Sequence, residues 1–329
     1  MNPTILLVDM ASHDRENWKA FLTRHNYEVL TADNAESARL LCHCQHPDLV
    51  LLHDHSPHMR GPDLCRQLKQ DPVNQLTPVV VLSPRPALAE LVEAREASAA
   101  GFWSTPASLG EEIGHIESML RLRSCVDEQA KSVILSVALS VESCHSRTGG
   151  HSDRLARYAH RLGECLGLST DDLQELRLGC LLHDIGKLAV PDTILLKPGP
   201  LNPEETEIVR QHPITGVTIC APVKCLHPIL PIIRHHHERM NGSGYPDGLR
   251  GEEIPLKARI LQVADVFDAL TSDRAYRKAL PSREAMQILR QEATYGWLDA
   301  SLVWKFSRMR PAANRPAAHS RRTVSSYLA

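Results

Sequence analysis

Histidines and aspartates recur in the second half of the chain within runs that are otherwise apolar. His183 and Asp184 adjoin in "LLHDIGKL", and His236 and His237 stand directly before the glycine-broken segment "NGSGYPDG". Burying such a side chain without a partner costs several kcal/mol. Because neutral imidazole and carboxylate together suit first-row transition metals, and one aspartate can bridge two cations, these pairs indicate metal chemistry.

Three further segments carry the same residue types on or beside a helix. His151 stands at the start of "HSDRLARYAHRL", His212 lies in "RQHPITG", and Asp265 lies in "QVADVFDAL". Taken alone, each of them could be a core residue that is hydrogen-bonded by its neighbours. Together with the two pairs they are enough for a two-metal centre assembled from several helices.

The elements that would position these residues differ between the two halves of the chain. Up to about residue 120, short apolar runs such as "TILLVD", "DLVLL" and "PVVVLS" alternate with helical stretches. This pattern indicates a doubly wound parallel sheet covered by helices on both faces. A proline-free stretch over about 110–147 is expected to be one helix that continues into a second domain, which is all-helical as far as residue 308.

Composition and charge narrow the function classes. A hydrophobic content of 43% and a charged content of 23% are typical of a folded, water-exposed protein. The formal net charge of -2 gives no reason to expect nucleic-acid binding, and no apolar tract is long enough for a membrane helix. The N-terminus lacks the basic region of a signal peptide, so we expect a cytoplasmic protein with reduced cysteines.

The first half of the chain resembles response-regulator receiver domains, which have a flavodoxin-like fold, through "ILLVDM" and "PDLVLLHDHSPHMRG". Phosphorylation in that family needs an aspartate nucleophile, carboxylates that hold magnesium, and a compensating cation. The residues that this chain has at or next to the matching positions are Asp9, His53, Asp54, Ser83 and Thr105. Since the nucleophile, one acid and the lysine are replaced, the resemblance implies a degenerate receiver, not phosphorylated on aspartate and kept for dimerisation or docking.

Residues 140 to 300 resemble the HD-GYP family of cyclic di-GMP phosphodiesterases, a branch of the HD phosphohydrolases. The likeness rests on "GGHSDRLARYA", "LLHDIGKLAVPDTILLKPGPL" and the triplet Gly244, Tyr245 and Pro246. It implies an all-α HD-type domain with metal ligands at His151, His183, Asp184, His212, His236, His237 and Asp265, of which Asp184 bridges. Trinuclear members carry a glutamate where this chain has Arg147, and a guanidinium cannot bind a cation. Two metals are therefore expected, iron or manganese first, with zinc or nickel as alternatives.

The same resemblance assigns roles around the metals. The bridging aspartate and Lys187 are expected to be catalytic, with Lys187 also meeting a phosphate oxygen of the substrate. A basic edge made by Arg274, Arg277 and Lys278 is expected to hold the second phosphate, with a solvated charged face as the alternative. Tyr245 is expected at the rim of the site, against a guanine base or a partner protein.

Three functions remain open at this point. The first is a metal-dependent hydrolysis of cyclic di-GMP to pGpG or on to GMP, and the second is a weakly active sensor or adaptor that acts on diguanylate cyclases or other proteins. The third is an HD phosphohydrolase for another nucleotide. We expect a receiver-like domain over 1–122, a helical linker over 123–145, the phosphodiesterase domain over 146–308 and a disordered basic tail over 309–329; a homodimer is left open.

Overall fold

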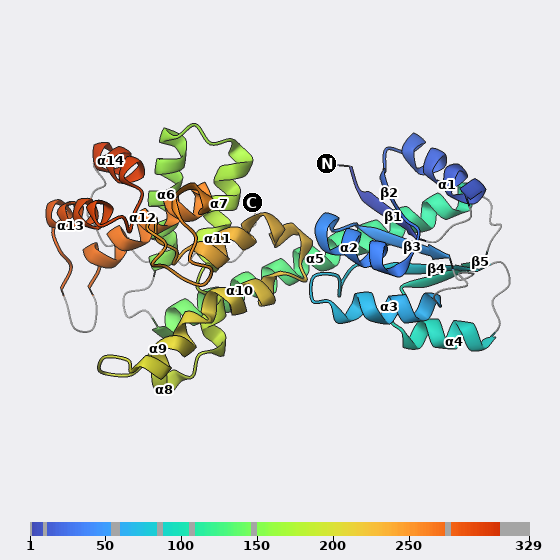
Figure 1. Cartoon of the computed structure of the whole chain (residues 1–329), viewed down its shortest axis with the longest axis horizontal. Helices are drawn as coiled ribbons and strands as arrows, with labels where there is room; N and C mark the ends of the chain where they lie inside the picture. The colour runs from blue at the N-terminus through green and yellow to red at the C-terminus, as the bar shows by residue number, and fades with distance from the viewer. Residues whose placement is uncertain are drawn as a thin grey trace. The chain divides into compact units, whose positions relative to one another are not determined.

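The computed structural model describes residues 2–8, 12–53, 60–83, 88–104, 109–145, 150–273 and 278–309. The chain divides into two compact units, whose elements are labelled in Figure 1. Unit 1 comprises Met1–Ala130 with Pro222–Cys225, and unit 2 comprises Lys131–Ala221 with Leu226–Ala329. The tail that follows Met309 lies outside the described residues.

Unit 1 is built on a five-stranded parallel sheet with the strand order β2-β1-β3-β4-β5. The strands are β1 (Thr4–Val8), β2 (Glu28–Ala32), β3 (Leu49–His53), β4 (Val79–Ser83) and β5 (Gly101–Ser104). The helices are α1 (Ser12–Arg24), α2 (Ala35–Gln45), α3 (Gly61–Gln70), α4 (Leu88–Glu96) and the first part of α5 (Leu109–His145). Strand β1 lies between β2 and β3, and its Val8 pairs with Ala32 on one side and Leu52 on the other.

The alternation of side chains along the strands supplies an apolar layer to each face of the sheet. Leu6 and Val8 belong to a buried cluster with residues of α2, α3 and α4. Ile5 and Leu7 belong to a second cluster, with residues of α1 and with Ile116 of α5. The helices visible above and below the sheet in Figure 1 are these two sets, so the predicted doubly wound domain is confirmed.

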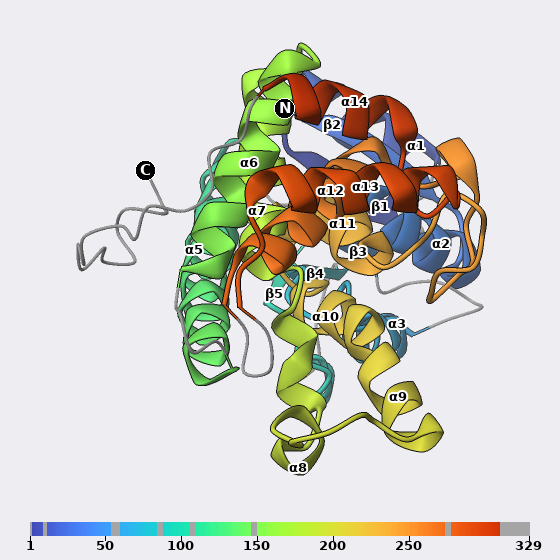
Figure 2. The same cartoon turned by 90° about the vertical axis from the view of Figure 1, so that its left-hand side faces the viewer.

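Unit 2 is entirely helical in the part that the structure describes. After the second part of α5 its elements are α6 (His151–Cys165), α7 (Thr170–Leu182), η1 (Ile185–Ala189), α8 (Asp192–Leu195), α9 (Pro203–Arg210), α10 (His212–Cys220), η2 (Lys224–Ile229, begun in unit 1), α11 (Leu230–His235), η3 (Gly251–Glu253), α12 (Leu256–Thr271), α13 (Ser282–Thr294) and α14 (Ala300–Arg308). Helix α6 packs against both α7 and α12, and all three are labelled in Figure 2. The predicted helical second domain is confirmed.

Three aromatic rings join helices that are distant in the sequence. Tyr158 of α6 lies edge-to-face against Phe267 of α12 and Phe306 of α14, at centroid distances of 5.2 and 6.1 Å. The two phenylalanines are themselves 5.1 Å apart. Edge-to-face pairs of this kind add to the stabilisation from burial, so the cluster fixes α12 relative to α6.

A short segment between α10 and α11, Pro222–Cys225, belongs to unit 1 and makes polar contacts within it. Arg123 of α5 donates to the carbonyl oxygen of Pro222 at 3.2 Å, and Nζ of Lys224 donates to Oδ1 of Asp48 at 2.6 Å. Arg123 also donates to Asp127 one turn further along α5, at 3.1 Å. Unit 1 is therefore completed by residues from far along the chain.

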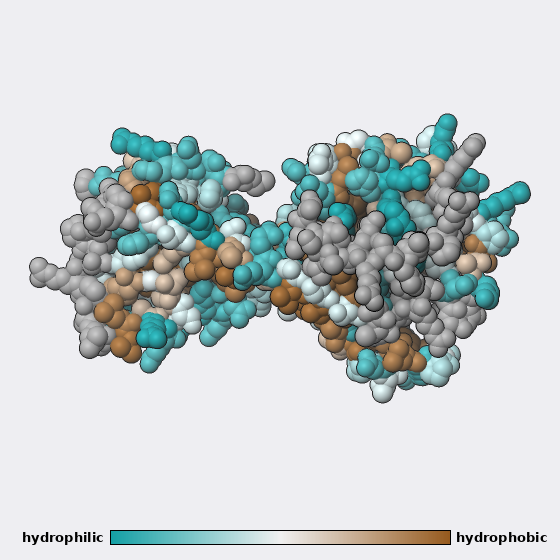
Figure 3. All heavy atoms as spheres, turned by 180° about the vertical axis from the view of Figure 1, so that it is seen from behind, coloured by the Kyte–Doolittle hydropathy of each residue, from teal (hydrophilic) through white to brown (hydrophobic). Residues whose placement is uncertain are grey.

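The described helices include none long and apolar enough to serve as a membrane span. The longest, α5, carries charged residues over most of its length and serines within its most apolar stretch. Hydrophilic side chains, in teal, occupy parts of both units on the face shown in Figure 3.

Helix α5 places a buried carboxylate in unit 1. Glu112 is 3% exposed and lies one turn before Ile116, and neither of its oxygens has a hydrogen-bond partner among the described residues. Burial raises the pKa of Glu112 from 4.5 to about 7. Because the folded chain holds this proton more tightly than the unfolded chain, stability is lost as the pH rises between these two values.

Replacing Glu112 with glutamine should stabilise unit 1 at alkaline pH and not at acidic pH. At about pH 8 the substitution removes an ionised buried carboxylate, whereas at about pH 4 the carboxyl group is already neutral in both states. We expect the unfolding temperature of Glu112→Gln to exceed that of the parent by several degrees at the higher pH, measured by scanning calorimetry of the full chain. A difference that is the same at both pH values would contradict this.

Candidate metal centre

The structure brings together all seven residues that were expected to bind metals. They come from the start of α6 (His151), the end of α7 (His183, Asp184), the start of α10 (His212), the end of α11 (His236, His237) and the middle of α12 (Asp265). Their ligand atoms form two groups, Asp184 with His212, His236 and His237, and His151 with His183 and Asp265, and within each group these atoms lie within 4.8 Å of one another.

Local backbone contacts orient three of the imidazoles. In His183, His212 and His236, Nδ1 lies 2.9, 2.7 and 2.7 Å from the carbonyl oxygen three residues earlier. A carbonyl oxygen only accepts hydrogen bonds, so each Nδ1 carries a proton that it donates. The Nε2 atom is then the one directed at Asp184, at 3.2 Å from His183, 3.3 Å from His212 and 3.9 Å from His236.

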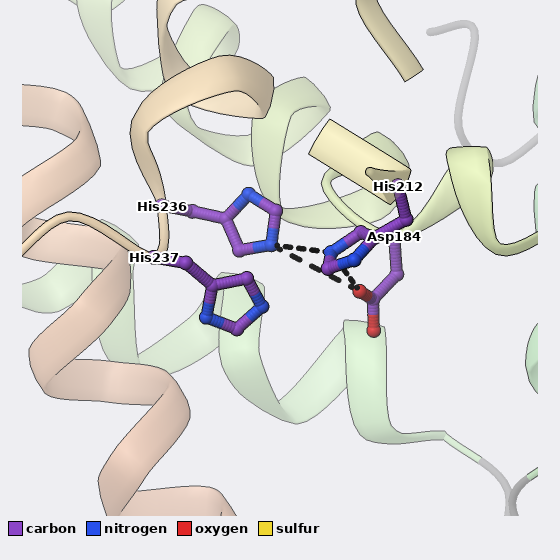
Figure 4. A group of neighbouring side chains, drawn as sticks. All are labelled: Asp184, His212, His236 and His237. Carbon is purple, nitrogen blue, oxygen red and sulfur yellow. Dashed lines mark hydrogen bonds and ion pairs between the residues drawn. The ribbon is translucent and has the colours of Figure 1, made fainter. Parts of the chain in front are cut away.

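Figure 4 shows the first group, in which the imidazole nitrogens and a carboxylate oxygen that carry lone pairs are directed toward one another. Nε2 of His212 lies 3.2 Å from Nε2 of His236, and with Nδ1 as the donor in both rings two neutral imidazoles have no proton to place between them. Oδ1 of Asp184 is buried and has no hydrogen-bond partner in the described part of the chain. Such a set repels itself unless a cation sits among its members, so the residues present fit a divalent metal ion.

Asp184 lies between the two groups. Its Oδ1 faces His212 of the first group, and its Oδ2 faces His183 of the second, so each oxygen is directed at a different group. The rings of His183 and His236 also meet, with centroids 5.1 Å apart. This arrangement suits a carboxylate shared by two cations.

Burial and charge favour the protonation states that bind metals. Burial and, to a smaller extent, the neighbouring His212 together lower the pKa of His237 to about 3. Burial also holds the pKa of His236 well below its ordinary value. For Asp184 burial alone would raise the pKa, but Lys187 and His183 outweigh it and hold the pKa well below the usual range. Neutral imidazoles and an ionised carboxylate result.

His183 is the exception among these groups. Burial disfavours its charge, yet the adjacent Asp184 outweighs burial and raises the pKa of His183 to about 9. A metal ion that binds Nε2 of His183 must therefore displace a proton, and metal uptake at neutral pH should release it.

Gly186 explains how Asp184 reaches His212. A β-carbon at this position would lie 1.9 Å from the carbonyl oxygen of His212 and 2.6 Å from the amide nitrogen of Gly216. Only glycine allows η1 to pack directly on the backbone at the start of α10. The close approach of these two backbones places Asp184 beside His212.

A buried carboxylate that the sequence reasoning did not single out orients His151. Asp268 of α12 is 1% exposed and accepts hydrogen bonds from Nδ1 of His151 and from Nε of Arg154, both at 2.7 Å. Nε2 of His151 is thereby left facing Asp265, at 3.5 Å. The signal in the sequence was the spacing of Asp265 and Asp268, which places both on one side of a helix.

The glycine-broken turn after His237 folds back over that histidine. Gly244 makes this possible, because a β-carbon there would lie 2.4 Å from backbone atoms of Glu238 and Arg239. The Tyr245 ring stacks on His237, with centroids 4.8 Å apart and an angle of 23° between the rings. Its amide donates to the carbonyl oxygen of His237 at 3.2 Å. The turn thus covers one metal-binding residue with an aromatic ring.

Two sequence models of known families match this chain. One, described as "HD domain", matches residues 137–302, and the other, described as "Response regulator receiver domain", matches residues 5–116.

The chain belongs to the HD-domain family. Its HD domain follows a response regulator receiver domain, and the family resemblance expected from the sequence is confirmed.

Three curated relatives are similar to this chain, two of them over most of their own length. The "Cyclic di-GMP phosphodiesterase response regulator RpfG" of Xanthomonas campestris pv. campestris is 32% identical over 271 residues, which are 75% of this chain and 72% of that protein. A "Cyclic di-GMP phosphodiesterase" of Thermotoga maritima is 30% identical over 316 residues, 86% of this chain and 84% of that one. The "3'3'-cGAMP-specific phosphodiesterase 2" of Vibrio cholerae is 38% identical over 172 residues, 52% of this chain and 32% of that protein.

A third cluster of candidate ligands in the HD domain has carboxylates that already accept hydrogen bonds from the protein. His235, Glu238 and Asp247 also place ligand atoms within 4.8 Å of one another. The buried Glu238, however, accepts the amides of Asp247, Gly248 and Leu249 at 2.7, 3.0 and 3.1 Å. Asp247 accepts Nε and Nη2 of Arg234, both at 2.7 Å. These carboxylates anchor the glycine-broken turn, and their oxygens are not available in the way that Oδ1 of Asp184 is.

The remaining expected substrate residues are described only in part. Lys187 lies on η1 and donates to Oδ2 of Asp184 at 2.6 Å. Lys278 is exposed in the segment between α12 and α13. Arg274, Arg277 and also Arg147 lie outside the described residues.

The receiver domain places its two described candidates at the carboxyl ends of neighbouring strands. His53 ends β3, paired in register with Leu82, and Ser83 ends β4 with a buried hydroxyl. Asp9, Asp54 and Thr105 lie outside the residues that the structure describes. The carboxyl edge of a parallel sheet is where a ligand site of such a fold is expected.

Replacing Asp268 with asparagine should weaken metal binding by the group that contains His151. The neutral asparagine side chain is a weaker hydrogen-bond acceptor than the carboxylate of Asp268, so it holds the His151 ring less firmly. Loss of such a partner costs roughly 10- to 100-fold in metal affinity. We expect manganese titration of Asp268→Asn to show one weakened site and one site near the parent affinity.

Asp299→Asn is the matched control, because Asp299 is also a buried aspartate paired with an arginine, Arg259, at 2.8 Å, and is not part of either ligand group. Equal effects of the two substitutions would show that Asp268 acts only on the stability of the fold.

Proposed function

We propose that the HD domain is a metal-dependent phosphodiesterase that hydrolyses cyclic di-GMP to pGpG and on to GMP. The observation that carries this proposal is the position of Asp184, with one oxygen directed at each of two imidazole-containing groups. The names of the relatives from Xanthomonas and Thermotoga support the choice of substrate.

Two divalent cations would be held by the two groups with Asp184 shared, iron or manganese first and zinc or nickel as alternatives. When bound, they supply the Lewis acidity that activates water and offsets the charge of the attacked phosphate. The side chain of Asp184 is 30% exposed, so a substrate can approach at the shared carboxylate while the histidines around it are buried.

Two side chains besides the metal ligands would contact the substrate near the reacting phosphate, Lys187 and Tyr245. The Lys187 ammonium, 2.6 Å from Asp184, is placed to meet a phosphate oxygen and to stabilise negative charge that develops there. Burial raises the pKa of Tyr245, and Asp184 raises it further, so its hydroxyl stays protonated and can donate a hydrogen bond. Arg274, Arg277 and Lys278 remain candidates for the second phosphate.

Hydrolysis should depend on the two central residues of the site. Parent protein loaded with manganese or ferrous iron should convert cyclic di-GMP to pGpG and GMP. Liquid chromatography of the reaction mixture measures both products. We expect His183→Ala and Asp184→Asn to lower kcat by at least about 1,000-fold, because the first change removes a ligand of one group and the second alters the carboxylate shared by both.

His160→Ala serves as the control histidine, since His160 lies on the exposed side of α6 and pairs only weakly with Glu164, at 3.5 Å. Tight binding of cyclic di-GMP without turnover by the parent would contradict the enzyme and favour a sensor that acts through protein partners.

The receiver domain, we further propose, is not phosphorylated on aspartate. His53 stands at the end of β3, where an aspartate nucleophile would be needed, and an imidazole cannot form an acyl phosphate. Incubation with acetyl phosphate and magnesium should give no phosphoryl increment in the intact mass. A modified peptide carrying phosphate on Asp54 would overturn the proposal, and a triple variant, Met10→Asp with His53→Asp and Thr105→Lys, which restores all three replaced groups, provides the positive comparison.

A further inference from the structure

Tyr245 is not an open platform for a base, because two described side chains lie against its ring. His237 stacks on it at a centroid distance of 4.8 Å, and Cζ of Arg210 lies 5.4 Å from the same centroid. A cation over an aromatic face is held there by the charge distribution of the ring. Of the three side chains His237, Tyr245 and Arg210, the one whose charged group can contact a ligand is therefore Arg210.

The backbone of Arg210 is fixed relative to the metal centre. Arg210 is the last residue of α9, and His212 begins α10 two positions later. Nδ1 of His212 donates to the carbonyl oxygen of Val209 at 2.7 Å, which closes the turn on both sides of Arg210. The guanidinium is thus held near the site from two directions, through its own backbone and through Tyr245.

The charge of Arg210 is only weakly compensated by the protein. Among the described residues, the carboxylate that reaches it is that of Glu207, at 4.0 Å, and these two side chains are 52% and 63% exposed. Exposed pairs at this distance contribute little. A guanidinium that lies over a ring also keeps the N–H donors in its own plane available, and these match the oxygens of a phosphate in a two-pronged contact.

We propose that Arg210 binds the phosphate of a cyclic dinucleotide that is not being cut, an inference that rests on the function proposed above. Lys187 contacts Asp184, and Arg210 lies over the ring that stacks on His237, so two separate elements bring positive charge to one ligand cluster. A substrate with two phosphodiester groups needs positive charge at each of them, and Arg210 adds to the charge that Arg274, Arg277 and Lys278 would supply at the second phosphate. The role is binding, and Arg210 takes no part in the chemical step.

The test compares Arg210→Ala, Arg210→Lys and the control Arg308→Ala in the metal-loaded full chain. Arg308 is also an arginine over an aromatic ring, with Cζ 4.7 Å from the Trp304 centroid, on a helix that contributes no residue to the metal-binding groups. We expect Arg210→Ala to raise KM for cyclic di-GMP roughly tenfold with kcat within about twofold, since one charge-assisted contact is lost. Arg210→Lys should restore part of the loss, and Arg308→Ala should change nothing.

Two further substrates separate a phosphate contact from the alternatives. Bis(p-nitrophenyl) phosphate has no second phosphate, so its kcat/KM should be the same in the parent and in Arg210→Ala. The KM for cyclic di-AMP, which has the same phosphates and adenine in place of both guanines, should rise by the same factor as for cyclic di-GMP. A rise confined to cyclic di-GMP would assign Arg210 to guanine, and a loss with bis(p-nitrophenyl) phosphate would show a disturbed metal site; either result overturns the proposal.

Equilibrium binding of cyclic di-GMP keeps this inference separate from the proposed hydrolysis. If the parent binds the dinucleotide without cutting it, the hydrolytic function fails, and the ratio of dissociation constants between Arg210→Ala and the parent still tests Arg210. If the parent neither binds nor cuts it, both proposals are wrong.

Discussion

The structure of the HD domain depends on one electrostatic constraint, which is that several electron-pair donors converge on Asp184 and are largely removed from water. Two of the imidazoles approach to 3.2 Å with their protons committed elsewhere, and one oxygen of Asp184 is buried without a hydrogen bond. Neither feature is stable in an apolar interior unless positive charge lies between the donors. Bringing these donors together costs conformational and desolvation free energy. A bound metal ion would offset this cost, which links metal binding to the stability of the fold.

The backbone around the cluster is arranged to impose this convergence. Carbonyl oxygens three residues before His183, His212 and His236 set the direction of each ring. Gly186 removes the one side chain that would separate η1 from α10, and Gly244 does the same for the turn that carries Tyr245. The rings are therefore positioned by hydrogen bonds and close packing that exist independently of any ligand, which is the preorganisation that a catalytic metal site requires.

Much of this arrangement could be predicted from the sequence, because it follows from residue type within an apolar helical pattern. The seven histidines and aspartates were recognisable as polar groups in runs that must be buried. The parallel sheet followed from alternating strand and helix patterns. In each case the signal lies within a few neighbouring residues.

What could not be predicted depends on contacts between distant segments. Asp268 acts on a histidine 117 residues earlier, and Lys224 in the Pro222–Cys225 segment of unit 1 pairs with an aspartate 176 residues away. Nothing in the local pattern of Glu238 distinguishes a metal ligand from an anchor for three amides. Likewise, no local pattern indicates that Arg210, at the end of α9, lies over Tyr245.

Anomalous diffraction from crystals of the manganese-loaded chain, recorded at the manganese absorption edge, tests the shared role of Asp184 most directly. Two peaks should flank this carboxylate, one among His212, His236 and His237 and the other among His151, His183 and Asp265. A single peak on one side, or density at His235, Glu238 and Asp247 in place of these groups, would contradict a two-metal centre bridged by Asp184.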